Sequence, residues 1–259
     1  MNKIKILFVI GDIGGGHRST SIAIANALNN RFPGKYETEI LDIFTESKSV
    51  WDWALKEGYS ISSNELIWTY AISYWSTDFP RVIRILSDIT AAKIVNRMKR
   101  YLSHRKPDMI ISVHPFTTNP IISAREQAGL KMPVITVVSD PFTGHAAWFC
   151  DLRPDLFILF SRLAKARAEM YGLKNDKIFI SQIPIKPIFN NPLPEEKKNE
   201  WIKKIKIDRD KTTILLAGGG EGLRGSIPII NELNRFKEKP NILVAVSYTH
   251  LTLPTKRIV

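Results

Sequence analysis

A short apolar run, a glycine-rich turn and a helix follow one another near the amino terminus, and this junction constrains the fold most. Residues 5–10 are an apolar run of the kind that lies buried in a parallel sheet. Three successive glycines at 14–16 and then His17 lead into a helix predicted over residues 18–28. Amides without a neighbouring Cβ atom, at the amino end of a helix, favour an anionic or oxygen-rich ligand. We therefore predict a ligand site at this turn, with His17 at its rim.

Two known glycine motifs nearly fit this turn, and neither is complete. Gly11 and Gly16 have the spacing of a Walker P-loop, but His17 stands where that loop needs lysine. A dinucleotide fingerprint would need a glycine at position 19, which is Ser19 here. Ser19 or Thr20 is expected to cap the first helical turn. A tight turn with a solvated histidine stays open as the alternative.

Apolar runs alternate with helical segments along most of the chain. Strands are predicted at residues 37–43, 109–113, 134–138, 156–160 and 178–181, and helices over 121–128, ending at Gly129, and over 162–171. This alternation predicts the α/β class with a doubly wound parallel sheet, whose ligands bind beyond the carboxyl ends of the strands. The polar residues predicted at those ends are His17, Asp42, His114, Asp140 and His145. For the last three, a purely structural role in a turn or loop stays open.

Aromatic and basic residues crowd into the region between the second and third predicted strands. Four of the six tryptophans of the chain lie within residues 50–79. Such a density fits either a helical pair packed on the domain or amphipathic aromatics at a membrane interface. Residues 81–106 are predicted to form a long helix with eight basic residues and one acid, Asp88. The formal net charge of +12 indicates a polyanionic partner, and the lack of a nucleic-acid reader motif favours an anionic lipid surface.

The composition excludes several classes of protein. A single cysteine, Cys150, excludes an internal disulfide framework and fits a reducing compartment. No apolar run approaches the roughly 18 residues that would span a bilayer, and the first apolar run is too short for a secretory signal. We therefore expect a cytoplasmic protein that is peripheral on the inner face of the membrane.

The carboxyl-terminal part begins with a proline-rich segment over residues 184–194, which predicts a linker and a domain boundary. A charged helix is expected over residues 195–206, and a strand over 212–217 runs into glycines at 218–222, a second junction suited to phosphate. Residues 242–246 start another strand. Residues 247–259 do not continue the pattern and resemble translated adapter read-through, so we expect a non-native tail.

Five segments together resemble one known family. They are residues 14–19 (GGGHRS), 112–115 (SVHP), 137–149, 184–189 (PIKPIF) and 218–222 (GGGEG). In this order they resemble the monogalactosyldiacylglycerol synthase family. That family includes bacterial diacylglycerol glucosyltransferases and is akin to the lipid II N-acetylglucosaminyltransferase. Gln182 stands where a glycine is usual, and Arg224 and Gly225 extend the last loop.

The resemblance implies a GT-B fold and an inverting transfer of galactose or glucose from a UDP-sugar to diacylglycerol, without a metal or another cofactor. Residues 1–190 would be the lipid-acceptor domain and residues 191–246 the beginning of the UDP-sugar donor domain. His17 matches the proposed catalytic base. The residues assigned to acceptor binding are Gly14, Gly15, Gly16, His114, Asp140 and His145, and those assigned to donor binding are Gly218, Gly219, Gly220, Glu221 and Gly222.

The implied partners are diacylglycerol, anionic membrane lipids and UDP-galactose or UDP-glucose, with no nucleic acid and no obligatory protein partner. Because the donor domain would be incomplete, we expect the 259-residue chain to be truncated and catalytically inactive. Two alternatives stay open. The first is a non-catalytic membrane-docking protein, and the second is another nucleotide-binding enzyme, such as a dehydrogenase in which Asp42 holds a ribose.

Overall fold

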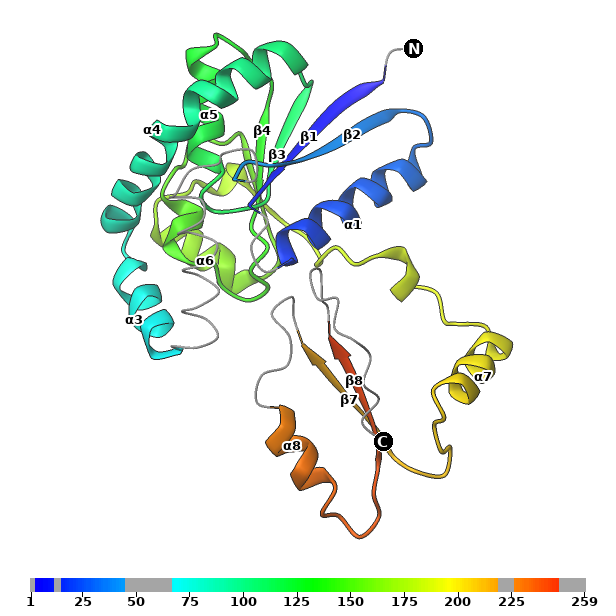
Figure 1. The fold of residues 1–259 in the computed structure, drawn as a ribbon. Helices are drawn as coiled ribbons and strands as arrows, with labels where there is room; N and C mark the ends of the chain where they lie inside the picture. The colour runs from blue at the N-terminus through cyan, green and yellow to red at the C-terminus, as the bar shows by residue number, and fades with distance from the viewer. Residues whose placement is uncertain (1–2, 12–14, 45–66, 219–225, 247–259) are drawn as a thin grey trace. The chain divides into compact units, whose positions relative to one another are not determined.

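The computed structural model describes residues 3–11, 15–44, 67–218 and 226–246 (Figure 1). Contacts between Cα atoms divide the chain into two compact units, Met1–Asn190 and Asn191–Val259. The division falls within the proline-rich segment over residues 184–194. The roles predicted for the two domains stay predictions.

The first unit is built on a six-stranded sheet in the order β2-β1-β3-β4-β5-β6, and every neighbouring pair is parallel. Its strands are β1 (Ile4–Ile10), β2 (Tyr36–Asp42), β3 (Met109–Ser112), β4 (Val134–Val137), β5 (Leu156–Leu159) and β6 (Ile178–Ile180). All six predicted strands are present, so the prediction of a parallel α/β sheet is confirmed.

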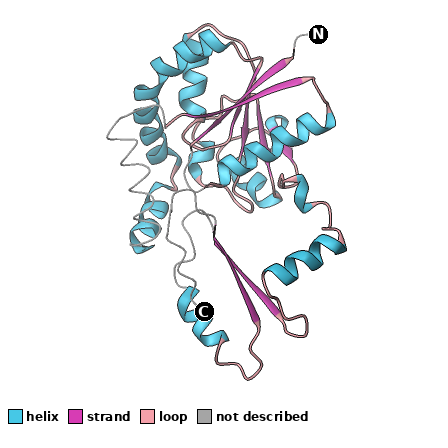
Figure 2. Cartoon of the chain, turned by 45° about the vertical axis from the view of Figure 1, so that its right-hand side comes forward, coloured by secondary structure: helices cyan, strands magenta, loops and turns pink. Residues whose placement is uncertain are grey.

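Helices cover both faces of this sheet (Figures 1 and 2). The described helices of this unit are α1 (Gly16–Arg31), α3 (Ile67–Thr77), α4 (Pro80–Arg105), α5 (Thr118–Gln127) and α6 (Arg162–Met170). Short 3-10 turns lie at Ala146–Phe149 (η1), Asn175–Lys177 (η2) and Pro187–Phe189 (η3). Of these helices, α3 packs on α4. Alternate residues of β1 face opposite sides. Leu7 and Val9 pack in a core cluster with α4 and α5, whereas Phe8 packs on the other face with Ala25 of α1. The sheet is therefore doubly wound, as predicted.

The first helix begins earlier than the sequence pattern predicted. Gly15 takes the N-cap position with φ of 71°, and no side chain caps the helix. The amide of Ser19 donates to the carbonyl of Gly15 over 3.0 Å, so Ser19 lies inside the first turn. The predicted cap at Ser19 or Thr20 is wrong, because glycine enters the left-handed region without steric cost and lets the turn close sooner. The predicted stop at Gly129 is confirmed by its φ of 65° just after α5.

The aromatic and basic region carries an exposed apolar surface. Trp68, Trp75 and Phe79 are all exposed, and Trp75 keeps 77% of its surface. In α4, Ile83, Ile94, Val95, Met98 and Leu102 are buried, whereas other apolar residues face outward. Four of these apolar residues are exposed, namely Val82, Ile85, Leu86 and Ile89. Trp51, Trp53 and Tyr59 lie outside the described residues.

We call the exposed apolar residues of this region the apolar stripe. From α3 it contains Trp68, Ile72 and Trp75, and from α4 it contains Val82, Ile85, Leu86 and Ile89, with Phe79 between the two helices. Apart from the adjacent pair Ile85 and Leu86, their numbers advance by three or four, which is the spacing of one helical face. None of the described helices has both the length and the hydropathy that a membrane span requires.

The second unit contains α7 (Glu195–Lys204), β7 (Thr213–Gly218), α8 (Ser226–Leu233) and β8 (Asn241–Val246), and β7 pairs with β8 in parallel. The predicted helix and both predicted strands are confirmed. Among the residues of this unit whose burial the structure describes, none is buried. Residues 247–259, predicted to be a non-native tail, lie outside the described residues.

Candidate active site

The carboxyl edge of the sheet has a topological switch point between β1 and β3. The chain leaves β1 to form β2 on one side, and it later returns to form β3 on the other side. Loops that leave neighbouring strands in opposite directions open a crevice at this edge, where ligands of such sheets bind. The segment that carries His17 follows β1, the one that carries His114 follows β3, and Ser139 and Asp140 follow β4.

His17 lies at the second position of α1, where its side chain is partly exposed. Its Nδ1 is 3.0 Å from the Oγ of Ser139. Its ring meets the ring of His114 edge-on, with centroids 4.6 Å apart, and lies 6.0 Å from the Trp148 ring. The structure thus brings together two of the predicted site residues and adds Ser139, which sequence reasoning missed although it also follows a predicted strand.

His114 forms a buried wall of this site, with 5% of its surface exposed. Its Nδ1 accepts a hydrogen bond from the amide of Phe116 over 3.2 Å. Burial, and secondarily the nearby charge of His17, hold the pKa of His114 well below its ordinary value of 6.5. His114 is therefore neutral at neutral pH.

A buried network of hydroxyl groups lies next to His114 and was not predicted. The Oγ of Ser112 is 2.7 Å from the Oγ1 of Thr117 and 2.9 Å from that of Thr118. Thr118 reaches Thr136 of β4 over 3.3 Å, and Thr117 donates to the carbonyl of His114 over 2.8 Å. These bonds satisfy the hydroxyl groups and tie β3, β4 and the start of α5 together. They fix the backbone that carries His114.

Asp140 and His145 are held in the loop after β4. One carboxylate oxygen of Asp140 accepts from the indole N–H of Trp148 over 2.9 Å and from the amide of His145 over 3.3 Å. The Nδ1 of His145 accepts from the amide of Ala147 over 3.1 Å, and its Nε2 lies 3.2 Å from the carbonyl of Tyr74 in α3. These contacts position η1 and attach α3, and the predicted role of both residues in acceptor binding stays a prediction.

The glycines of the turn leave open space. A Cβ atom added at Gly15 or Gly16 would meet no heavy atom within 4 Å, and Gly14 lies outside the described residues. Asp42, the residue proposed to hold a ribose in the dehydrogenase alternative, is buried, and its carboxylate accepts from the amide of Phe44 over 3.0 Å. Within the structure as described, its carboxylate is therefore engaged by its own turn.

The predicted donor loop is described only at its first residue, Gly218, which ends β7. Gly219, Gly220, Glu221 and Gly222 lie outside the described residues. In the part of the chain that the structure describes, no group of three or more His, Cys, Asp or Glu side chains could hold a metal ion. The expectation that the reaction uses no metal stays a prediction.

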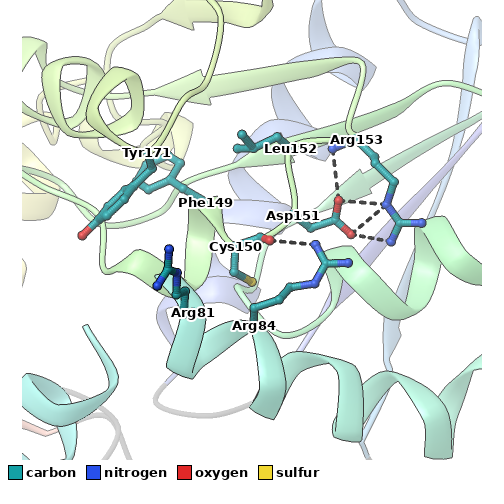
Figure 3. Close-up of a pocket in the computed structure, with 8 residues that line it drawn as sticks. All are labelled: Arg81, Arg84, Phe149, Cys150, Asp151, Leu152, Arg153 and Tyr171. Atoms are coloured by element: carbon teal, nitrogen blue, oxygen red, sulfur yellow. Dashed lines mark hydrogen bonds and ion pairs between the residues drawn. The ribbon is translucent and has the colours of Figure 1, made fainter. Parts of the chain in front are cut away.

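A separate hollow of about 670 Å³ lies between the start of α4 and the segment after η1 (Figure 3). It is lined by Arg81, Arg84, Phe149, Cys150, Asp151, Leu152, Arg153 and Tyr171. Arg84 donates to the carbonyl of Cys150 over 2.8 Å, and Arg153 pairs with Asp151. Burial raises the pKa of the Cys150 thiol, which therefore stays protonated near neutral pH. We therefore assign these residues a structural role and not a catalytic one.

Comparison with known proteins decides the family. A sequence model of the monogalactosyldiacylglycerol (MGDG) synthase family matches residues 17–185 of the 259-residue chain. The chain belongs to the MGDG synthase family. The resemblance found in the sequence is thereby confirmed, and the matched range begins at His17.

Plant members of the family are similar over most of this chain. The probable MGDG synthase of Nicotiana tabacum is 32% identical over 224 residues, which are 85% of this chain and 41% of the tobacco protein. MGDG synthase 1 of Arabidopsis thaliana is 30% identical with the same coverage. Both relatives are described as chloroplastic. This MGDG synthase family member thus spans less than half the length of the curated relatives it matches.

A solved structure supports the fold assignment. The UDP complex of S. aureus MnaA aligns with 97% of this chain and 64% of its own, with a TM-score of 0.51 and 12% sequence identity. At that identity the likeness concerns the fold alone. Together with the six-stranded parallel sheet, it confirms the predicted GT-B-like α/β class.

Proposed function

We propose that this chain works in an inverting glycosyltransferase that moves galactose or glucose from a UDP-sugar to the hydroxyl group of diacylglycerol. The observation that carries the proposal is the partly exposed imidazole of His17, beside His114 and Ser139 at the switch point of the sheet. Family membership supports the reaction class. His17 is proposed as the general base and Gly15 and Gly16 as the floor against which the acceptor lies.

The chemistry agrees with these residues. An alcohol is a poor nucleophile at neutral pH and needs a positioned base, for which a histidine is suited. His114 is buried and neutral, and His145 has its Nδ1 engaged by a backbone amide, so His17 is the best placed of the three. The leaving UDP gains negative charge, which amides at a helix terminus can stabilise without a metal ion. We propose no cofactor.

The apolar stripe supports docking on a membrane. An acceptor dissolved in a bilayer requires a protein that meets the bilayer surface, and exposed Trp and Phe side chains are favoured at that interface. The net charge of +12 adds attraction to anionic lipids. We propose that α3 and the first half of α4 lie on the inner face of an anionic membrane, with the diacylglycerol reached from there.

The deciding experiment is photolabelling of the 259-residue chain with a photoactivatable diacylglycerol in vesicles of phosphatidylglycerol and phosphatidylcholine. We expect labelled peptides that contain His17 or Ser139, and loss of that label when unlabelled diacylglycerol competes. The matched control is a photoactivatable phosphatidylcholine, which should label the apolar stripe only.

The same experiment separates a second candidate function, a membrane-docking protein without catalysis. The exposure of the apolar stripe favours this candidate independently of the site. If diacylglycerol and phosphatidylcholine label the stripe alike and neither labels the peptides around His17, docking stands and the transferase proposal fails.

Transfer itself is tested in a chimera that joins Met1–Asn190 to the carboxyl-terminal half of the tobacco relative. We expect hexose transfer to diacylglycerol, reduced at least about 100-fold by His17→Ala, because a positioned base contributes that much or more. The control is His104→Ala on the exposed side of α4. Unchanged turnover of the His17→Ala chimera would remove His17 from the mechanism.

A further inference from the structure

The three histidines near the carboxyl edge differ in what their Nδ1 atoms meet. The Nδ1 atoms of His114 and His145 each lie against a backbone amide, at 3.2 and 3.1 Å. An amide N–H can only donate, so both atoms must present a lone pair, and a neutral ring then carries its proton on Nε2. The backbone therefore dictates the tautomer of these two residues.

The Nδ1 of His17 instead lies 3.0 Å from the hydroxyl group of Ser139. A hydroxyl group can donate or accept, so this contact is compatible with a proton on Nδ1. When the Nε2 of a general base takes a proton from an alcohol, Nδ1 must carry a proton as well, and an oxygen that accepts from it stabilises the imidazolium. A backbone amide in the place of Ser139 would oppose this charge.

Ser139 is also held rigidly. It follows Val138, which is buried directly after β4, and its neighbour Asp140 accepts a hydrogen bond from the indole of Trp148. His17 is restrained as well by its T-shaped contact with the ring of the buried His114. The contact between Ser139 and His17 thus joins the segments that follow β4 and β1, 122 residues apart in the chain.

We propose that Ser139 is a positioning residue for His17. The hydroxyl oxygen of Ser139 accepts the proton on Nδ1 of His17, so the lone pair of the neutral ring lies on Nε2, the atom that takes the proton of the acceptor alcohol. This assignment rests on the proposed function for its purpose, although the hydrogen bond itself can be tested without sugar or lipid. It distinguishes Ser139 from the hydroxyl groups of Ser112, Thr117, Thr118 and Thr136, which bond to one another.

The test is imidazole ¹⁵N NMR of the 259-residue chain, with the signals of His17 assigned through His17→Gln. Spectra are recorded at a pH where His17 is neutral, for the unaltered chain, Ser139→Ala and Ser139→Thr. We expect the Nδ1–H tautomer of His17 in the unaltered chain and in Ser139→Thr. In Ser139→Ala the ratio of the Nδ1–H to the Nε2–H tautomer should fall about fivefold, as expected for the loss of one hydrogen bond.

His145 provides the internal control, because its backbone-bound Nδ1 should keep the Nε2–H tautomer in all variants. An Nε2–H tautomer of His17 in the unaltered chain would overturn the proposal. So would a tautomer ratio that Ser139→Ala leaves unchanged, or one that Ser139→Thr fails to retain. If the tautomer behaves as expected while diacylglycerol does not label the site, the positioning contact stands and the proposed function alone fails.

Discussion

The rings of His17 and His114 meet edge to face, and their surroundings differ. His114 is buried, and its pKa is held well below 6.5 by burial and by the charge of His17. His17 is partly exposed and meets a hydroxyl group. Because His114 stays neutral, it places no second charge beside His17, which suits the role of general base proposed for His17.

The buried His114 makes the stability of the first unit depend on pH. Below pH 6.5 the unfolded chain protonates this residue while the folded protein does not, so the free energy of unfolding falls as the pH decreases through that window. The slope from this residue is at most about 1.4 kcal/mol per pH unit. We expect His114→Gln to flatten this pH dependence in denaturant unfolding measured between about pH 7 and about pH 5, the range in which an unperturbed histidine titrates. The matched control His104→Gln, on the exposed part of α4, should keep it.

Gly11, the residue after β1, lies close against the rings of Phe44 and His114. A Cβ atom at Gly11 would lie 2.7 Å from the Cε2 of Phe44 and 3.0 Å from the Cδ2 of His114, and both rings are buried. We expect Gly11→Ala to lower the free energy of unfolding by about 1–3 kcal/mol through overpacking. Gly16→Ala, whose Cβ meets nothing within 4 Å, should be nearly neutral in the same measurement. Equal effects of the two substitutions would contradict the steric reason.

At this scale the sequence reveals residues through local pattern only. His17 and His114 were predicted because each follows an apolar run and a turn. Ser139 and the hydroxyl network were missed, because their contacts join residues that are distant in the chain or that look like ordinary turn residues. Asp140 and His145 were found by pattern, but pattern alone could not show that they bond to Trp148 and to α3.

At the scale of elements, Asp78 joins three segments that sequence reasoning treated separately. Its carboxylate accepts from the amide of Ala146 at the start of η1 over 2.9 Å, forms an ion pair with Arg167 of α6, and lies 3.6 Å from the Nε2 of His145. Asp78 itself directly follows α3. This residue therefore connects the end of α3 to the body of the unit.

We expect Asp78→Ala to lower the free energy of unfolding by about 1–3 kcal/mol, because it leaves the partly buried groups of Arg167 and Ala146 without their acceptor. The matched control is Glu169→Ala, which removes an exposed ion pair with Lys165 and should cost under about 0.5 kcal/mol. Hydrogen exchange should also show faster opening of α3 in Asp78→Ala. Unchanged exchange in α3 would contradict this connecting role.

The apolar stripe predicts a separable effect on membrane binding. Trp75→Ser together with Phe79→Ser removes two exposed aromatic side chains and should weaken binding to phosphatidylglycerol vesicles at least about tenfold in sedimentation. The midpoint of thermal unfolding should stay unchanged, because neither side chain is buried. A variant that loses stability but keeps its vesicle affinity would show that these aromatics serve packing instead.

The sequence allowed the helices and strands to be predicted, but not which of their apolar residues are buried. Each of the eight strands in the described part of the chain follows from a short apolar run between turn residues. The apolar residues of α4 surround much of the helix, so periodicity did not reveal that Ile83 is buried while Ile85 is exposed. That division depends on α5 and η1, which pack against α4 from other parts of the chain.

At the scale of the whole molecule, the two units differ in their cores. The first unit has buried clusters on both faces of its sheet, whereas none of the residues whose burial is described in the second unit is buried. A two-stranded sheet gains too little apolar burial to be stable alone. We therefore expect the second unit to open far more often than the first.

Trypsin under native conditions should cut first within residues 191–246 and leave a resistant fragment that corresponds to Met1–Asn190. Mass spectrometry of a digestion series measures this order. For the same reason we expect no hexose transfer from UDP-galactose or UDP-glucose by the 259-residue chain alone. Equal cleavage rates in the two units, or transfer that His17→Ala abolishes, would contradict this expectation.

The strand order also has a consequence for how the first unit folds. From β3 onward each new strand joins the edge left by the one before it, so these pairings close short loops in chain order. The pairing of β1 with β3 is different, because the partners Lys5 and Asp108 at its start are 103 residues apart. Closing this long loop costs more chain entropy than closing the shorter loops of the other pairings, and the cost comes before the stabilising contacts have formed. We therefore expect this pairing to limit the folding rate, so that the crevice which holds His17 and His114 is the last part of the sheet to be assembled.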